Sequence, residues 1–219
     1  MAYELCIFDL DGTLTDPKVG ITKSFQHALS VFEIQENANS LEKLIGPPLR
    51  DSFKNYYGFS ETDTEKAVIK FREYFTETGL FENTVYPGIE KTLQELISHE
   101  KILAVATSKV TVYANKILEH FNLNKYFSFV FGDEMDGRRT KNGKRDIIKS
   151  VIKTLDPESK MTSVMIGDRK HDIIGAKENE IDSIGVTWGY GSRDELELEK
   201  TTWIVDSTVA LCDLILNKQ

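Results

Sequence analysis

The sequence predicts an α/β protein in which helices cover both faces of a parallel sheet, with an all-helical insertion after the first strand. Short apolar runs rich in Val, Ile and Phe recur along the 219 residues with little alternation, as in strands buried on both faces. Segments with helical spacing separate most of these runs, and this alternation implies parallel strands joined by right-handed crossovers. The exception is residues 16–83, where only helical patterns occur.

Six apolar runs are expected to form the sheet. In chain order they are Leu5–Phe8, Ile102–Ala106, Phe127–Phe131, Ser163–Ile166, Ile184–Val186 and Trp203–Val205. Apolar residues three and four positions apart predict helices between them, over residues 89–98, 112–118 and 147–152. Ser207 is the expected N-cap of a last helix. The sheet domain is therefore expected to comprise residues 1–15 and 84–219.

Residues 16–83 are expected to form a separate helical domain. Two helical stripes come first, made of Ile21, Phe25, Leu29 and Phe32, and of Leu49, Phe53, Tyr56 and Tyr57. Gly58 closes the second stripe, and Ser60 and Asp63 have capping-box spacing before a third helix that Gly79 ends. We expect the aromatic residues of these helices to form the core of the insertion.

Composition limits the function classes. The formal net charge is −8, which excludes a general binder of nucleic-acid polymers or anionic membranes, since both reward a basic surface. The sequence contains no stretch long enough to span a membrane and no signal-peptide pattern, so we expect a cytoplasmic protein. Separately, we expect a monomer or weak dimer. Cys6 and Cys212 lie in apolar runs and are expected to be core residues rather than a disulfide or metal pair.

Carboxylates directly follow two of the predicted strands. Asp9 and Asp11 come after the first strand, and Asp168 and Asp172 follow a later one. In open parallel sheets, sites form beyond the carboxyl ends of the strands, so Asp9, Asp11 and Asp168 converge if these strands are neighbours. Carboxylates packed together cannot all stay ionised without a cation. Oxygen-only ligands suit Mg²⁺, and Gly12 allows the chain to turn sharply around the ion.

Four motifs in order resemble those of the haloacid dehalogenase superfamily, in its phosphatase branch. They are "FDLDGTLTD", the strand end at Thr107, the lysine-bearing "GRRTKNGKRDII" and "IGDRKHD". The insertion is similar to the helical cap of the phosphoglycolate phosphatase-like group, and "IGPPL" and "GYGS" look closest to members described as 5'-nucleotidases or phosphoglycolate phosphatases. The resemblance implies a Rossmann-like core with a cap domain. It also implies Mg²⁺-dependent hydrolysis of small phosphate monoesters, either nucleoside monophosphates or phosphoglycolate-like compounds.

The resemblance assigns roles to the four carboxylates. Asp9 is the expected nucleophile, which forms an aspartyl-phosphate. Asp11 is the expected general acid for the leaving oxygen and then the general base for water. Its backbone carbonyl would join the side chains of Asp9 and Asp168 on the metal. Asp172 is expected to orient a metal-bound water or a ligand, and the alternative is a helix acid favoured by the dipole of the first turn.

Phosphate binding is expected from three further positions and a lysine. The resemblance implies that Thr107, with Ser108 and the turn at Gly12, binds phosphate oxygens through hydroxyl and N–H groups. A lysine should neutralise the phosphate beside the nucleophile, and Lys141 and Lys144 both compete for this role. The resemblance favours Lys144, because in the nucleotidase-like relatives this lysine stands just before an acidic residue and paired aliphatic residues, as in "KRDII" at the start of a predicted helix.

Two other cationic side chains are candidates for the site. Lys109 could approach the phosphate, but a solvated lysine at a helix start is the expected arrangement. Arg50, which follows "IGPPL", is a candidate for reaching the substrate from the cap, and a surface arginine is the alternative.

Two other functions share part of this pattern. A sugar phosphomutase has the same motifs and cap but returns the phosphoryl group to its product. A non-enzymatic receiver-like domain also combines a parallel sheet with a phosphorylated Asp, but it needs no helical insertion and no Asp-x-Asp-Gly-Thr after the first strand.

Overall fold

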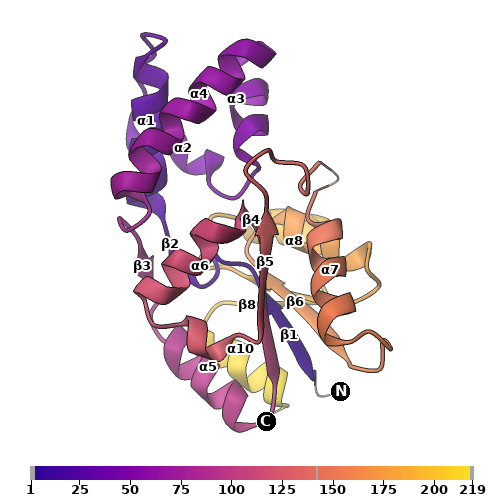
Figure 1. The fold of residues 1–219 in the computed structure, drawn as a ribbon. Helices are drawn as coiled ribbons and strands as arrows, with labels where there is room; N and C mark the ends of the chain where they lie inside the picture. The colour runs from indigo at the N-terminus through magenta and orange to yellow at the C-terminus, as the bar shows by residue number, and fades with distance from the viewer. Residues whose placement is uncertain (1–2, 142, 218–219) are drawn as a thin grey trace. The chain divides into compact units, whose positions relative to one another are not determined.

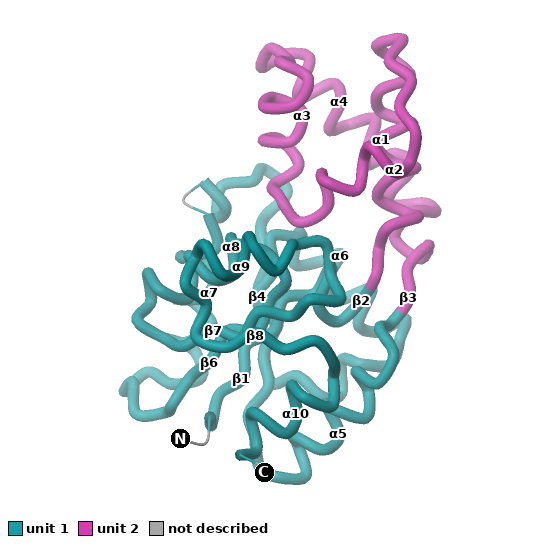
Figure 2. Tube along the Cα trace, turned by 180° about the vertical axis from the view of Figure 1, so that it is seen from behind, with its two compact units in different colours: residues 1–15, 85–219 teal, residues 16–84 magenta. Residues whose placement is uncertain are grey.

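The computed structural model describes residues 3–141 and 143–217, and it divides into two compact units (Figure 2). The first unit comprises residues 1–15 and 85–219, and the second comprises residues 16–84. No described helix is both long and apolar enough to cross a membrane.

The first unit is built on a six-stranded sheet in which every neighbouring pair of strands is parallel (Figure 1). The strands are β1 (Leu5–Phe8), β4 (Ile102–Val110), β5 (Phe129–Asp133), β6 (Ser163–Gly167), β7 (Asp182–Val186) and β8 (Trp203–Val205). The helices of this unit are α5 (Ile89–Ser98), α6 (Thr111–His120), α7 (Arg145–Leu155), α8 (Lys170–Lys177), α9 (Arg193–Leu198) and α10 (Thr208–Leu216). The predicted α/β class is confirmed.

The strand order explains where a site can form. The order is β5-β4-β1-β6-β7-β8, so the chain runs outward from β1 in one direction and later in the other. Such a reversal opens a crevice beyond the carboxyl ends of the central strands. Phe8 of β1 pairs with both Val105 of β4 and Ile166 of β6. The residues that follow these three paired positions therefore emerge side by side.

Apolar packing fixes these strand ends. Leu5 and Ile7 of β1 and Met165 of β6 are completely buried with the apolar stripe of α7, which consists of Ile147, Ile148 and Val151. Cys6 and Cys212 are buried free thiols, as expected, and burial raises the pKa of the Cys6 thiol to about 12. The core thus fixes the start of α7, and with it the backbone of Lys144, which immediately precedes this helix.

The second unit is helical. Its helices are α1 (Lys18–Ser30), α2 (Ala38–Leu41), a 3₁₀ turn (Glu42–Leu44), α3 (Leu49–Tyr57), α4 (Glu61–Tyr74) and a π-helical turn (Phe75–Gly79). Gly58 ends α3 in the left-handed conformation, and the Ser60 side chain caps α4 by accepting the Asp63 N–H. The ring centroid of Phe25 lies 5.2 Å from that of Phe53 and 5.0 Å from that of Phe71, so these aromatic residues form the core of the unit.

Some details differ from the expected elements. Thr15–Asp16 (β2) and Thr84–Val85 (β3) pair where the chain passes from one unit to the other, and two-residue strands are too short to leave a periodic pattern. Strand β4 continues to Val110 rather than ending at Ala106, with an irregular register after Ala106. Tyr56 is 48% exposed instead of joining the core, and the Lys43 ammonium lies over its ring.

Candidate active site

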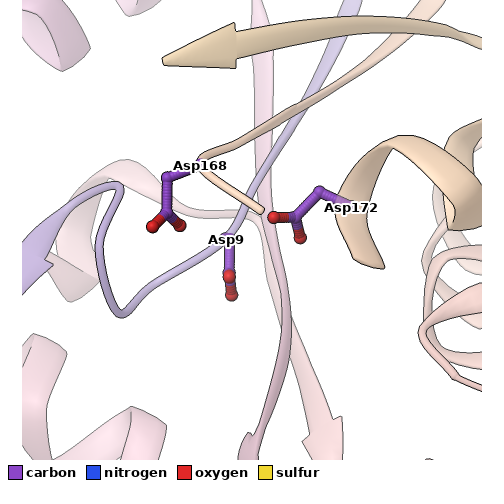
Figure 3. Close-up of side chains that lie close together, drawn as sticks. All are labelled: Asp9, Asp168 and Asp172. Carbon is purple, nitrogen blue, oxygen red and sulfur yellow. The ribbon is translucent and has the colours of Figure 1, made fainter. Parts of the chain in front are cut away.

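Three of the carboxylates predicted to follow the strands cluster, but they are not the three expected: among the described residues, Asp172 rather than Asp11 joins Asp9 and Asp168. Asp9 follows β1, while Asp168 and Asp172 follow β6, and ligand oxygens of these three residues all lie within 4.8 Å of one another (Figure 3). Asp168 and Asp172 are fully buried. Burying several ionised carboxylates together without a compensating positive charge would cost free energy of folding.

Lys144 supplies positive charge to this cluster. It immediately precedes α7, its Nζ lies 2.8 Å from Oδ2 of Asp9 and 2.5 Å from Oδ1 of Asp172, and the residue is only 3% exposed. Burial disfavours the ammonium, but the Asp172 and Asp9 carboxylates outweigh it and raise the pKa of Lys144. Lys141, the competing candidate, is exposed. The structure therefore brings Lys144, and not Lys141, to the carboxylate cluster.

Asp172 contacts both Lys144 and the main chain at the start of α8. Its Oδ1 accepts the Lys144 ammonium, and its Oδ2 accepts the backbone N–H of Arg169 at the start of α8 (3.1 Å). Gly167 makes this close approach possible, since a Cβ there would lie 2.2 Å from the Asp172 carboxyl carbon. Both Asp172 oxygens thus have protein donors, so this residue fixes Lys144 and the first turn of α8.

Asp168 is held by a loop after β7. Its Oδ2 accepts the backbone N–H of Tyr190 at 2.7 Å, and its Oδ1 accepts the Thr13 hydroxyl at 3.3 Å. Trp188 ties the same loop to the β1 turn, because its indole N–H donates to the Thr13 carbonyl at 3.1 Å. Burial, together with the Asp172 and Asp9 charges, raises the pKa of Asp168 to about 8. A divalent cation between Asp9 and Asp168 would offset this repulsion, and the donor set fits one.

The turn after β1 packs directly against Asp168. Gly12 has a φ of +84°, and a Cβ there would lie 2.3 Å from Oδ2 of Asp168. Only glycine combines this backbone conformation with so close an approach. The expected turn at Gly12 therefore lets the main chain after β1 pack directly against the Asp168 carboxylate.

Asp11 has a partner that the sequence analysis placed in solvent. Nζ of Lys109 lies 2.7 Å from Oδ2 of Asp11, and the two side chains are only 8% and 11% exposed. The expectation of a solvated Lys109 at a helix start is wrong. Lys109 belongs to the irregular last part of β4 rather than to the following helix, and its side chain is buried there. Burial raises the pKa of the Asp11 carboxyl, and the Lys109 charge only partly offsets that effect.

The other candidate residues are placed as follows. Thr107 is buried within β4, just after the regular pairing with β5 stops at Ala106, and its hydroxyl accepts the backbone N–H of Lys109 at 3.2 Å. Ser108 is half-buried beside it. Arg50 belongs to the helical unit, where it forms a two-pronged ion pair with Glu65 (2.8 and 2.9 Å).

Besides Lys109, the sequence analysis missed the loop after β7 as part of the site. "GYGS" contributed to the family resemblance, but what it supplies to the site is the main-chain N–H of Tyr190, and a main-chain donor cannot be predicted from the residue type. The two glycines were the available signal, since a Cβ on Gly191 would lie 1.8 Å from the Asp168 carbonyl oxygen.

Replacing Gly189 with Ala should lower the free energy of unfolding by about 1–3 kcal/mol, as overpacking does. The added Cβ would lie 2.3 Å from the Gly12 carbonyl oxygen and 2.4 Å from Cβ of Asp168. Urea unfolding of G189A and wild type measures the effect. The control is Y190F, which keeps the main-chain donor to Asp168. An unfolding curve of G189A that overlays the wild-type curve would contradict this packing.

Comparison with known proteins identifies the family. The family model described as haloacid dehalogenase-like hydrolase matches residues 6–186. A 5'-nucleotidase from Pseudomonas aeruginosa is 43% identical over 214 residues, which cover 96% of this chain and 95% of that protein. The tyrosine-protein kinase PtkA of Mycobacterium tuberculosis is 36% identical over 200 residues, which cover 91% of this chain and 67% of that protein.

A solved structure agrees with these matches. The crystal structure of a predicted phosphatase from Clostridium acetobutylicum has a TM-score of 0.93 and 44% identity, and the match covers 99% of this chain and 100% of that one. The chain therefore belongs to the haloacid dehalogenase-like hydrolase family and is a phosphatase of that family, a phosphoric monoester hydrolase.

Proposed function

We propose that the protein is a magnesium-dependent phosphatase that hydrolyses small phosphate monoesters through an aspartyl-phosphate on Asp9. One observation carries the proposal. A fully buried lysine bridges the expected nucleophile to Asp172, next to Asp168, beyond the carboxyl ends of the two central strands. A purely structural cluster would gain little from this arrangement, because apolar residues of similar volume commonly stabilise a core at least as well as buried ion pairs.

Magnesium fits the residues present. The side chains of Asp9 and Asp168, with the backbone carbonyl of Asp11, are the proposed ligands, all of them the oxygen donors that Mg²⁺ prefers. When bound, the ion would neutralise phosphate oxygens and lower the repulsion that an incoming anion meets.

The side chains divide the reaction between them. A carboxylate oxygen of Asp9 attacks phosphorus while the bond to the leaving oxygen breaks, and Asp11 gives that oxygen a proton. Asp11 then takes a proton from water, whose oxygen bonds to phosphorus as the bond to Asp9 breaks. Lys144 and the hydroxyl and N–H groups of Thr107 and Ser108 stabilise the charge on the phosphoryl oxygens.

The proposed substrates are nucleoside monophosphates or phosphoglycolate-like esters. The similar Pseudomonas aeruginosa protein is named a 5'-nucleotidase. The "IGPPL" segment of this chain resembles family members described as 5'-nucleotidases or phosphoglycolate phosphatases. A screen of phosphate release from nucleoside monophosphates, phosphoglycolate and sugar phosphates tests the proposal. Parallel incubation with labelled ATP, whose terminal phosphate is an anhydride rather than a monoester, is expected to leave tyrosine unlabelled. Cleavage of none of these esters would refute the proposed function.

Removal of divalent cations should abolish the activity found in that screen, and Mg²⁺ should restore it. The physical reason is that a phosphate dianion must approach the buried Asp9 and Asp168 carboxylates, whose charge Lys144 alone does not cancel. Phosphate release is measured after EDTA treatment and again after titration with MgCl₂, with CaCl₂ as the comparison. Full activity in excess EDTA would contradict the metal assignment.

A further inference from the structure

We propose that Lys109 is a positioning residue for Asp11, which holds one carboxyl oxygen so that the other delivers the proton to the leaving group. The inference rests on the proposed function, in which Asp11 is the general acid. The four motifs assign Lys109 no role in that reaction, and this inference gives it one.

The two oxygens of Asp11 have different environments. Oδ2 lies 2.7 Å from Nζ of Lys109, and both side chains are about nine-tenths buried. Oδ1 is buried and has no hydrogen-bond partner among residues 3–141 and 143–217. A buried carboxyl oxygen without a donor is uncommon and points to a group that arrives later.

This asymmetry assigns the proton. A lysine ammonium carries three donors and no acceptor, so the Asp11 oxygen that it contacts must accept. When Asp11 is protonated, its proton therefore resides on Oδ1. As the Asp9 oxygen bonds to phosphorus and the bond to the leaving oxygen breaks, the proton moves from Oδ1 to that oxygen. Asp11 is left as a carboxylate whose Oδ2 is paired with Lys109.

The fold builds the position of Lys109. The pairing of β4 with β5 shifts register between Ala106 and Val110, and the Thr107 hydroxyl accepts the Lys109 N–H at 3.2 Å within this irregular segment. Gly132 of β5 makes room for it, since a Cβ there would lie 2.2 Å from the Lys109 carbonyl oxygen and 3.2 Å from Cγ2 of Thr107. Bulges of this kind are commonly used to aim a side chain at a site.

A positioning role differs from a structural one in its dependence on the leaving group. An alkoxide is a poor leaving group and needs the proton from Asp11, whereas 4-nitrophenolate leaves readily without it. Loss of Lys109 should therefore impair alkyl esters selectively. A residue that only stabilised the fold would impair both kinds of ester to the same extent.

The test compares kcat/KM for two esters in the full-length enzyme with Mg²⁺. The alkyl ester is the best nucleoside 5'-monophosphate or phosphoglycolate from the screen, and the second ester is 4-nitrophenyl phosphate. The parameter kcat/KM is chosen because it covers the steps up to departure of the leaving group. The variants are K109M and K109Q, of which K109Q retains a polar side chain if K109M does not fold. The control is K116M, at an exposed lysine of α6.

For K109M or K109Q, kcat/KM should fall on the order of 10²-fold with the alkyl ester, and by less than about tenfold with 4-nitrophenyl phosphate. The control should match wild type with both esters. Equal losses with both esters, or no loss, would overturn the inference while leaving the proposed function intact. If the wild type cleaves neither ester, the proposed function fails and the inference fails with it.

Discussion

Replacing Asp9 with Asn is expected to abolish turnover while the protein stays folded. Asn keeps the shape of the side chain but has no carboxylate to attack phosphorus, so the covalent route is lost. Loss of a nucleophile from a catalytic unit costs on the order of 10⁴–10⁶-fold in kcat in other hydrolases, and we expect a similar loss here. The amide also removes one of the two carboxylates that face Nζ of Lys144, which lies 2.8 Å from Oδ2 of Asp9.

Initial rates of phosphate release at saturating substrate measure this effect, and thermal unfolding followed by circular dichroism verifies the fold. The control is D206N, which makes the same chemical change at an exposed position after β8. Turnover of D9N within about tenfold of wild type, a difference of only about 1.4 kcal/mol in barrier, would rule out attack by Asp9.

Replacing Lys144 with Ala is expected to raise the reaction barrier by roughly 3–4 kcal/mol, comparable to the loss of an oxyanion donor. Its ammonium lies between Asp9 and Asp172, and the buried stripe of α7 holds its backbone in place. Charge that is already positioned need not reorganise during the reaction, so its removal is felt in the transition state. K141A should cost much less, because Lys141 is exposed.

The comparison requires kcat/KM for both variants and for K144M, which fills the space that Ala leaves. Removing one partner of a buried ion pair also destabilises a protein, typically by about 3–5 kcal/mol, so unfolding by urea is measured in parallel with and without Mg²⁺. An inactive K141A together with a near-normal K144A would show that Lys141 is the phosphate-binding lysine.

Sequence reasoning located the sheet and the carboxylates because both depend on local patterns. Strand β1 was predicted to the residue, since a buried parallel strand is a continuous apolar run and Asp9 marks its end. The neighbouring positions of Asp9 and Asp168 depend on strand order, which the sequence pattern left as a condition and the pairing of Phe8 with Ile166 shows.

The features that sequence reasoning missed arise from tertiary structure. A lysine after a strand end ordinarily lies in solvent, and only the shifted register of β4 and the absence of a side chain at Gly132 bury Lys109. The donor to Asp168 from Tyr190 is a main-chain N–H, which any residue except proline could provide.

Trapping the covalent intermediate tests the central claim most directly. Enzyme is quenched during turnover with its best substrate and treated with borohydride, which reduces an aspartyl-phosphate to homoserine, and the peptides are then sequenced by mass spectrometry. The proposal predicts homoserine at position 9 in the wild type, and none in D9N or in wild type without substrate. Homoserine at position 11, 168 or 172 instead, or an unmodified Asp9 in enzyme that is turning over, would contradict it.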